Sequence, residues 1–248
     1  MARRYFNWKL AIVLVIALVV LATAAVSLQQ WHKSTRAEQA LPKGEKAYEL
    51  EMWDEAAGYL GRYLIVNPDD TEVLLKYADA QLNRRPPLPG HQQQAITAYR
   101  SVLRYEPNNA EAAERLVEMY LRISPGEAEL VAKRYLERED DPNVARMFAE
   151  ALALQRRFPE AAAQLQRLIA QHPKHVPAYE LLARLAQQRP LDVNQPAVHW
   201  LDQAVAQNPD RALAYVARAD MHLRQGDPNQ AAADLALAQE CDLSDPDV

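Results

Sequence analysis

FPEAAAQLQRLIAQHP, residues 158–173, is the stretch of sequence that decides the fold of this chain. It predicts a helix with a small residue, Ala161, near its start. Pro173 follows its end, because proline lacks an N–H and disfavours helix in the residue before it. The same alanine-to-proline spacing recurs at three other places: Ala56 to Pro68, Ala95 to Pro107 and Ala197 to Pro209.

Two degenerate copies of the stretch surround Ala128 and Ala231. The six alanines are successively 39, 33, 33, 36 and 34 residues apart. A self-similar period near 34 residues, without the alternating pattern of strands, predicts stacked helical hairpins that share one continuous core.

Each unit can be numbered so that Ala161 is position 20 and Pro173 is position 32. Position 20 is alanine throughout, and position 8 is small in most units: Gly44, Ala78, Val117, Ala149, Ala183 and Ala219. Small residues at both positions let the two helices of a hairpin approach closely. Position 24 predicts the apolar face one turn later: Leu60, Tyr99, Ala132, Leu165, Leu201 and Leu235.

This pattern resembles that of tetratricopeptide repeat (TPR) proteins over nearly all of the chain after residue 36. The resemblance implies an all-α, right-handed superhelical solenoid of about six hairpins, preceded here by one transmembrane helix. The solenoid is expected over 42–248, with units at 37–70, 71–109, 110–141, 142–175, 176–211 and 212–245. The second unit carries an insertion around residues 84–90, which predicts a loop. The third lacks its terminal proline, and the last has Leu243 in its place.

The N-terminus predicts a signal anchor. Residues 1–9 contain three basic residues and no acid, and residues 10–31 contain no charge. At about 1.5 Å per residue, 22 helical residues span the hydrocarbon core. Tyr5, Phe6 and Trp8 flank one end and Trp31 the other, as aromatic belts do. The cationic flank predicts residues 1–9 in the cytoplasm and the repeats outside the cytoplasmic membrane.

Two alternatives to a retained anchor stay open. Ala22–Thr23–Ala24 is an A-x-A site after an apolar run, which is typical of a cleaved signal peptide and would give a periplasmic or secreted protein. Arg3–Arg4 also resembles part of a twin-arginine signal. After the anchor we expect a polar linker over 32–41 and a short first helix that starts at about Pro42.

The charge distribution argues against nucleic acid as a partner. Residues 1–36 hold five of the 28 Lys and Arg and none of the 33 Asp and Glu, which leaves the repeats with 23 bases, 33 acids and a net charge of −10. Nucleic-acid binding needs cations that neutralise phosphates. An acidic repeat region likewise argues against binding of the repeats to anionic lipid.

No motif in the sequence indicates catalysis, a cofactor or a metal, so the chain is not expected to be an enzyme. P-loop, G-x-G-x-x-G and G-x-S-x-G patterns are absent. Cys241 is the single cysteine, and we expect its thiol to have no chemical role. His172 and His175 flank Pro173 in an expected turn, with no further ligand at metal spacing. Glu160 lies on an expected helix surface at the repeat spacing, so we expect it to belong to the repeat structure and not to a catalytic acid–base pair.

A protein-binding surface is what remains. In TPR proteins the first helix of each hairpin lines a concave groove, so the resemblance implies ligand-facing residues on these helices. Position 9 is acidic in five of six units: Glu45, Asp79, Glu118, Glu150 and Asp220, with Arg184 as the exception. Neighbouring positions add apolar and basic residues: Tyr48, Leu75, Leu82, Leu121, Leu154, Val216, Leu223, Arg122, Arg146 and Arg224. The pattern predicts a groove for a basic protein segment, although charged residues that merely solvate a helix face would look the same.

The best interpretation is a membrane-anchored TPR scaffold or adaptor that binds protein partners in the cell envelope and assists assembly of a larger machinery. The alternative is a structural subunit of a stable membrane complex that uses its outer ridges. Asp245–Pro246–Asp247–Val248 looks like the opening of another repeat. We therefore expect either that the chain is a fragment of a longer protein or that a partner covers the last hairpin.

Overall fold

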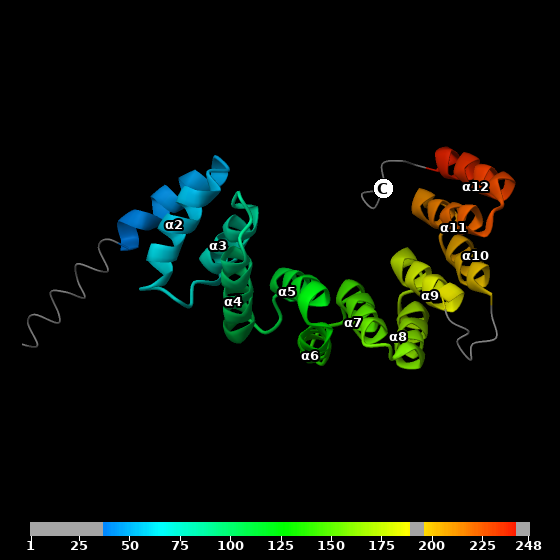
Figure 1. The fold of residues 1–248 in the computed structure, drawn as a ribbon, viewed down its shortest axis with the longest axis horizontal. Coiled ribbons are helices and arrows are strands. Elements are labelled where there is room, and N and C mark those ends of the chain that lie inside the picture. The colour runs from blue at the N-terminus through cyan, green and yellow to red at the C-terminus, as the bar shows by residue number, and fades with distance from the viewer. Residues whose placement is uncertain (1–36, 189–195, 242–248) are drawn as a thin grey trace, which may run out of the picture. The chain divides into compact units, whose positions relative to one another are not determined.

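The computed structural model describes residues 37–188 and 196–241, and all regular structure in these ranges is helical (Figure 1). Residues 37–49 form a first helix. Eleven further helices follow: α2 (Trp53–Leu64), α3 (Thr71–Asn83), α4 (Pro89–Tyr105), α5 (Ala110–Ile123), α6 (Pro125–Leu136), α7 (Pro142–Leu154), α8 (Phe158–Gln171), α9 (Val176–Gln188), α10 (Ala197–Gln207), α11 (Ala212–Gln225) and α12 (Pro228–Glu240).

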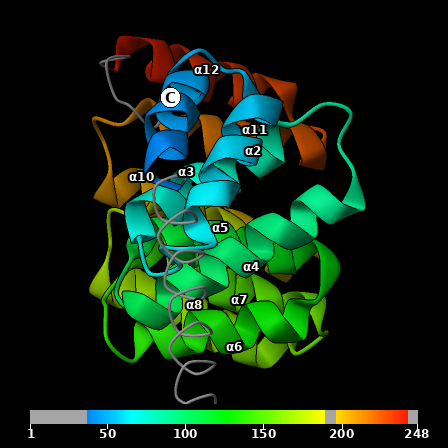
Figure 2. The same cartoon turned by 90° about the vertical axis from the view of Figure 1, so that its left-hand side faces the viewer.

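Consecutive helices pair into six hairpins, which fall into two compact units. Unit one, Met1–Tyr105, contains hairpin one (37–49 with α2) and hairpin two (α3 with α4). Unit two, Glu106–Val248, contains hairpins three to six: α5 with α6, α7 with α8, α9 with α10, and α11 with α12. Within unit two, pairs such as α11 and α12 lie side by side in both views (Figures 1 and 2).

The small residues at positions 8 and 20 make the hairpins, as the sequence predicts. All six position-20 alanines are buried. At position 8, a Cβ added to Gly44 would lie only 2.6 Å from Cδ2 of Leu60, the position-24 residue of the same hairpin. No real Cβ tolerates such an approach, so the side chain missing at Gly44 sets the distance between its two helices.

Local caps fix where several helices begin. The side-chain oxygens of Asp70, Asn109, Asp141 and Asp227 accept hydrogen bonds from backbone N–H groups in the first turns of α3, α5, α7 and α12. For example, Asn109 Oδ1 accepts from the Ala112 N–H at 3.0 Å. Such caps satisfy N–H groups that have no partner within the helix. The start of each of these four helices is therefore fixed by the residue just before it.

Two expectations are corrected by the structure. Helix 37–49 continues through Pro42 instead of starting there, because burial of Ala40, Gly44 and Ala47 along one face outweighs the one hydrogen bond that proline removes. Leu235 does not lie on the buried face of α12, where Asp234 is buried instead. The expected loop after α3 is confirmed for residues 84–88, although Pro89 and Gly90 already belong to α4.

No helix among the described residues is both long enough and apolar enough to cross a membrane. Residues 10–31, on which the membrane-anchor prediction rests, lie outside the described ranges, as do residues 242–248.

Candidate protein-binding surface

The first helices of the hairpins share one face of unit two. Helix α5 packs against α7, α7 against α9, and α9 against α11. The second helices follow another rule: α6, α8 and α10 pack against their own first helix and against the first helix of the next hairpin. We call the side formed by α5, α7, α9 and α11 the first-helix face. Residues at equal positions of these helices therefore lie side by side.

Each charged residue at position 9 of this face has a partner of opposite charge one turn away in its own helix. Glu118 Oε1 lies 3.0 Å from Arg122 Nη2, Glu150 Oε2 lies 2.9 Å from Arg146 Nη1, and Asp220 Oδ2 lies 2.8 Å from Arg224 Nε. The single base, Arg184, lies 3.9 Å from Glu180. The predicted acidic ladder is thus a row of i,i+4 ion pairs.

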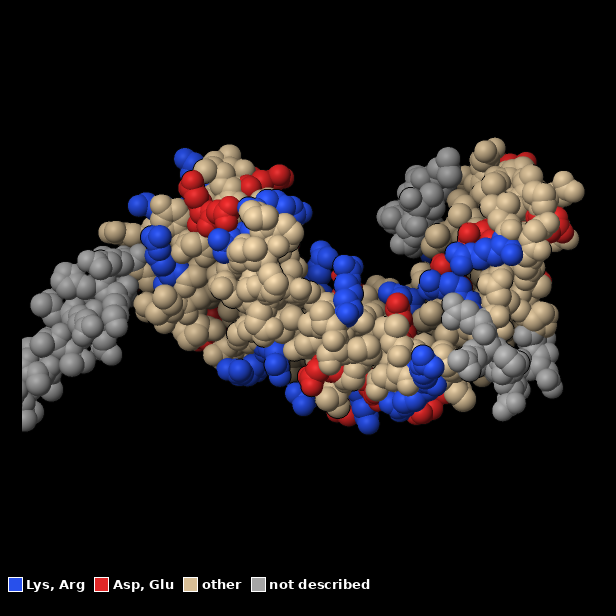
Figure 3. Space-filling model, viewed as in Figure 1, with Lys and Arg blue, Asp and Glu red and all other residues tan. Residues whose placement is uncertain are grey.

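These pairs balance the charge of the first-helix face. Each of α5, α7, α9 and α11 contributes one acid and one base to the row, so the face carries little net potential at position 9. Figure 3 shows Lys and Arg interspersed with Asp and Glu on the visible surface of α5–α12. A basic segment that binds here has to share each acid with an arginine that is already present, which lowers the free energy that it gains.

The predicted site residues of unit one are used largely for contacts between its two hairpins. The Tyr48 hydroxyl donates to Asp79 Oδ2 at 2.7 Å, and Lys76 Nζ lies 3.0 Å from Glu45 Oε1. The hydrogen bonds that Lys76 donates to Glu72 and Glu45 outweigh the cost of burial and raise the pKa of Lys76. Helix 37–49 is thereby tied to α3 through three of the predicted site residues.

The apolar members of the predicted groove divide into two kinds. Leu75, Leu82 and Leu121 are half-buried and belong partly to the packing between first helices. Leu154, Val216 and Leu223 are exposed, and a partner could cover them. Their exposure leaves aliphatic patches between the ion pairs, a composition that suits protein recognition better than binding of a charged small molecule.

A polar ladder that the sequence did not indicate joins three successive hairpins. Asn143 Nδ2 donates to Glu114 Oε1 at 3.0 Å, and Asn143 Oδ1 lies 3.2 Å from His175 Nε2. His172 Nε2 lies 2.9 Å from Asp140 Oδ1. Both histidines therefore contact residues of an earlier turn, and they border an open cleft of about 710 Å³ that Pro142, Lys174 and Arg211 also line. Nothing in the local sequence reveals contacts between residues so far apart.

A cluster of charged residues lies in hairpin six. Arg218 donates to both Asp234 oxygens, at 2.6 and 3.0 Å, and to Asp202 Oδ1 of α10 at 2.9 Å. His222 Nε2 lies 3.7 Å from Asp234 Oδ2. Hydrogen bonding to Asp234 outweighs burial and raises the pKa of Arg218. The cluster explains why Asp234 is buried at a place where an apolar residue was expected.

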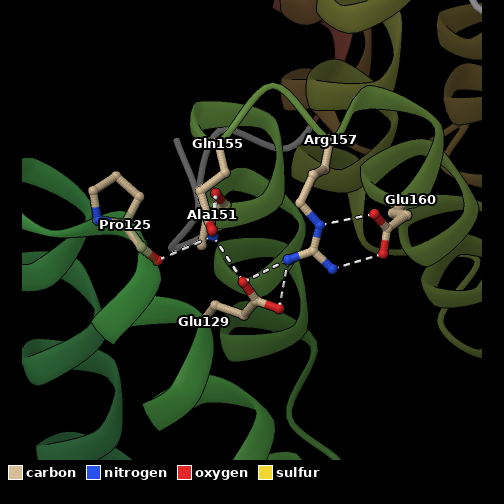
Figure 4. A network of polar contacts seen from close by, with 6 residues as sticks. All are labelled: Pro125, Glu129, Ala151, Gln155, Arg157 and Glu160. Carbon is tan, nitrogen blue, oxygen red and sulfur yellow. Dashed lines mark hydrogen bonds and ion pairs between the residues drawn. The ribbon is translucent and has the colours of Figure 1, made fainter.

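A network of polar contacts also links hairpins three and four (Figure 4). Arg157, in the turn between α7 and α8, donates to both oxygens of Glu160 and of Glu129 at 2.7–2.8 Å. Gln155 also donates to Glu129, at 2.8 Å. Burial opposes the change, but hydrogen bonds from Arg157 and Gln155 lower the pKa of Glu129, and Arg157 lowers that of Glu160. Glu160 is thus part of the architecture, in agreement with the sequence analysis.

Metal and nucleophile chemistry find no support in residues 37–188 and 196–241. No group of three or more His, Cys, Asp or Glu residues in these ranges could hold a metal ion. The Cys241 thiol donates to the Leu237 carbonyl oxygen at 3.3 Å. The arrangement of stacked first helices with exposed aliphatic residues instead defines a helical-repeat protein with a surface for protein contacts.

Comparisons with known families agree with this class. A family model described as tetratricopeptide repeat matches residues 72–109, and a second model with the same description matches residues 146–191 and 197–246. Together they cover more than half of the chain, which therefore belongs to the tetratricopeptide repeat family. No curated protein sequence matches the chain.

Solved structures share the fold at low sequence identity. The C-terminal part of a TPR repeat-containing protein from Cytophaga hutchinsonii is 14% identical with a TM-score of 0.58, and 97% of each chain is covered. A double mutant of MamA is 17% identical with a TM-score of 0.56, and 70% of this chain and 95% of that chain are covered. PilW, described as a type IV pilus biogenesis factor, is 17% identical with a TM-score of 0.55, and 82% and 92% are covered. At such identities the similarity shows the fold alone.

Proposed function

We propose that this chain is a membrane-anchored TPR scaffold that binds segments of other proteins on its first-helix face and assists the assembly of a larger machinery in the cell envelope. The observation that carries the binding role is the stack of α5, α7, α9 and α11 in unit two. It presents a row of ion pairs together with the exposed aliphatic residues Leu154, Val216 and Leu223.

The membrane part of the proposal rests on the sequence of the N-terminus. Residues 10–31 contain no charge, and Arg3, Arg4 and Lys9 precede them. This pattern favours a single helix across the cytoplasmic membrane with the repeats outside, where an anchored scaffold meets membrane-bound partners at raised local concentration. The fold shared with PilW, which is described as a pilus biogenesis factor, supports an assembly role by analogy only.

The ion pairs shape what the first-helix face binds. A partner segment with Lys or Arg has to share Glu118, Glu150 or Asp220 with the arginine already present. Each exposed pair contributes about 0–1 kcal/mol, so the charge contribution is small and falls with added salt. We therefore propose a partner segment that combines charged residues with apolar side chains, which fit between the ion pairs.

A charge swap tests the first-helix face without changing net charge. One variant reverses two ion pairs at once: Glu118→Arg with Arg122→Glu on α5, and Arg146→Glu with Glu150→Arg on α7. Each i,i+4 pair is kept, but its acid and its base exchange places. The partner that co-purifies after gentle membrane extraction should lose affinity at least several-fold, which corresponds to about 1 kcal/mol. Circular dichroism should remain that of the unchanged protein.

The matched control is a swap at the C-terminal end of α6, Arg134→Glu in its last turn with Glu137→Arg just after it, where both residues are exposed. It should leave partner binding unchanged. Loss of the partner in the α6 swap, with binding retained in the first-helix swap, would reject the groove and favour a structural subunit that uses its outer ridges.

The topology needs its own experiment, since no described residue bears on it. An alkaline phosphatase reporter fused after Val248 in a bacterial host is active only outside the cytoplasm, so activity in the membrane fraction is the expected result. An inactive reporter would contradict the orientation. Activity in a soluble protein cleaved after Ala24 would contradict the anchor and favour the signal-peptide alternative.

A further inference from the structure

Hairpin six has ionisable side chains at three positions where the other hairpins of unit two have mostly apolar residues. These are positions 7, 11 and 23, which are Arg218, His222 and Asp234 in hairpin six. The other three hairpins of unit two have Leu116, Tyr120 and Val131, then Phe148, Leu152 and Gln164, then Leu182, Ala186 and Trp200. A buried ion pair often stabilises a fold less than apolar residues of similar volume do. Stability alone therefore does not account for the three ionisable side chains.

Arg218 is shared between two carboxylates that differ in exposure. It donates to both oxygens of Asp234 on α12 and to Oδ1 of Asp202 on α10. Asp234 is buried, and the two hydrogen bonds from Arg218 balance its charge. The Asp202 side chain is 54% exposed, and its Oδ2 has no hydrogen bond to a described residue. Two carboxylates and one guanidinium leave one negative charge in excess.

His222 is the member of this cluster that lacks a hydrogen bond to any described residue. It is nine-tenths buried, with 9% of its surface exposed. Its Nε2 lies 3.7 Å from Asp234 Oδ2, which is beyond hydrogen-bond distance. Because the carboxylate favours the N–H on Nε2, the other ring nitrogen of neutral His222 is left as an acceptor. A buried polar group without a hydrogen bond costs free energy, so a donor that reaches His222 would recover this cost.

These residues border an open cleft of about 420 Å³ between α10, α11 and α12. The rest of its lining is Val198, Gln230, Ala233 and Leu237. The two aliphatic side chains and the alanine form an apolar wall, and the Gln230 side chain has no hydrogen bond to a described residue. Sites for ligands commonly have volumes of about 300–1,000 Å³. The cleft thus combines an apolar wall with several unused acceptors and an excess negative charge.

We propose that this cleft binds the side chain of an arginine from a partner protein. The methylene groups of the arginine pack on the apolar wall, and its guanidinium donates to Asp202 Oδ2 and to His222. Arginine suits the cleft better than lysine, because its planar group has five N–H donors for several acceptors. An acidic side chain would be repelled by the excess negative charge, and an aromatic side chain would leave that charge unpaired.

The cleft is separate from the first-helix face. None of its lining residues belongs to the ion pairs at position 9 or to the exposed aliphatic residues of that face. Either site can therefore exist without the other. If the cluster only links hairpin five to hairpin six, the cleft should have no affinity for a cation.

The test measures binding of N-acetyl-arginine amide to the full chain by NMR observed on this probe. Saturable binding with a Kd of about 1–10 mM is expected, because a ligand this small gains little free energy. N-acetyl-citrulline amide is the matched ligand control, since a neutral urea replaces the guanidinium in a side chain of the same shape. It should bind at least about fivefold more weakly, because hydrogen bonds to charged groups are stronger than neutral ones.

Two pairs of variants locate the binding. Ala233→Phe fills the cleft with a ring and should abolish binding, whereas Ala232→Phe adds the same ring at an exposed neighbour that does not line the cleft. Asp202→Asn removes the excess negative charge and should weaken binding at least about threefold. Asp210→Asn makes the same change at an exposed residue outside the lining. Both controls should change the Kd less than about twofold.

Equal affinity for the arginine and citrulline probes would overturn the proposal, as would no saturation up to about 50 mM. Binding that persists in Ala233→Phe, or that is lost equally in Ala232→Phe, would overturn it as well, because the probe would then bind elsewhere. All four substituted residues are exposed, so the variants are expected to fold, and circular dichroism checks this.

Discussion

The first and the last described hairpins end in opposite ways. Helix 37–49 presents Gln39 and Lys46 to solvent, whereas α11 and α12 present Val216, Leu223 and Leu235. Both edges have the same hairpin geometry, with buried small residues at positions 8 and 20. The difference shows that hairpin formation and hairpin stacking are encoded by different positions. A hairpin with correct positions 8 and 20 forms whether or not its neighbouring side is covered.

The position-24 leucines give the largest expected effect and the most direct way to break this comparison. Leu165→Ala removes a fully buried side chain between hairpins four and five and should cost about 2–5 kcal/mol of unfolding free energy. Leu235→Ala removes an exposed side chain of α12 and should cost less than about 1 kcal/mol. Urea denaturation of both variants measures the difference. Equal losses would show that Leu235 is covered in solution.

The position-20 alanines give the next largest effect. Ala161→Leu should overpack hairpin four and cost about 1–3 kcal/mol, because α7 and α9 leave its second helix no room to move. Ala231→Leu makes the same change in hairpin six, where α12 packs mainly against α11 and can shift away from it, and should cost less than half as much. The measurement is again the urea midpoint. A larger loss at Ala231 than at Ala161 would contradict the view that hairpin six has a free side.

Hydrogen exchange compares the two second helices without a mutation. Helix α8 is covered by α7 and α9, whereas α12 packs mainly against α11. Since repeat proteins lose stability from an uncovered end, amides of α12 should exchange at least about tenfold faster than those of α8, or about 1.4 kcal/mol.

Acid should weaken the link between hairpins three and four. The pKa values of Glu129 and Glu160 are lowered in the folded state by Arg157. Their contribution to stability is therefore fully present above the unfolded pKa of about 4.5 and is lost as the pH falls through the lower folded values. Below pH 4.5, the melting temperature of the unchanged protein should fall more steeply with pH than the melting temperature of the double variant Glu129→Gln with Glu160→Gln. Parallel curves for the two proteins would show that the network of Figure 4 does not form in solution.

The sequence was sufficient for the parts of the fold that depend on local residues. The position-20 alanines and the prolines after second helices predicted the hairpins, and caps such as Asn109 and Asp141 lie next to the helices they start. Pro42 was misjudged because a proline signals a helix start on average, whereas here three buried small residues hold the helix together. Local propensity yields to packing at this point.

Contacts between hairpins could not be predicted in the same way. Arg157 and Glu129 are 28 residues apart, and their pairing follows from how hairpins three and four stack. The exposure of Leu235 depends on what covers it, and its own sequence contains no such information. One signal was used only in part, and another was missed. Arg122 and Arg146 were named as basic neighbours of the position-9 acids, but their spacing of four residues from these acids was not interpreted as ion pairing. Arg218 stands where other units carry apolar residues such as Leu116 and Leu182, and its pairing with Asp234 was not predicted.

The ion pairs on the first-helix face should give the smallest effect on stability. Here hairpin three and hairpin six should not differ. Glu118–Arg122 on α5 and Asp220–Arg224 on α11 are both exposed i,i+4 pairs. Their strength depends on one turn of their own helix and on solvent, not on whether the hairpin has a covered side. Arg122→Ala and Arg224→Ala should each cost about 0.3–0.5 kcal/mol, and 1 M salt should remove most of it, because the Debye length then falls to about 3 Å. Urea denaturation at low and high salt measures both. A loss at Arg224 that is several times larger and insensitive to salt would mean that exposed side chains of α11 stabilise hairpin six through packing. In that case the stability of the two hairpins could no longer be separated into hairpin formation and stacking, and the difference between the leucine variants would need another explanation.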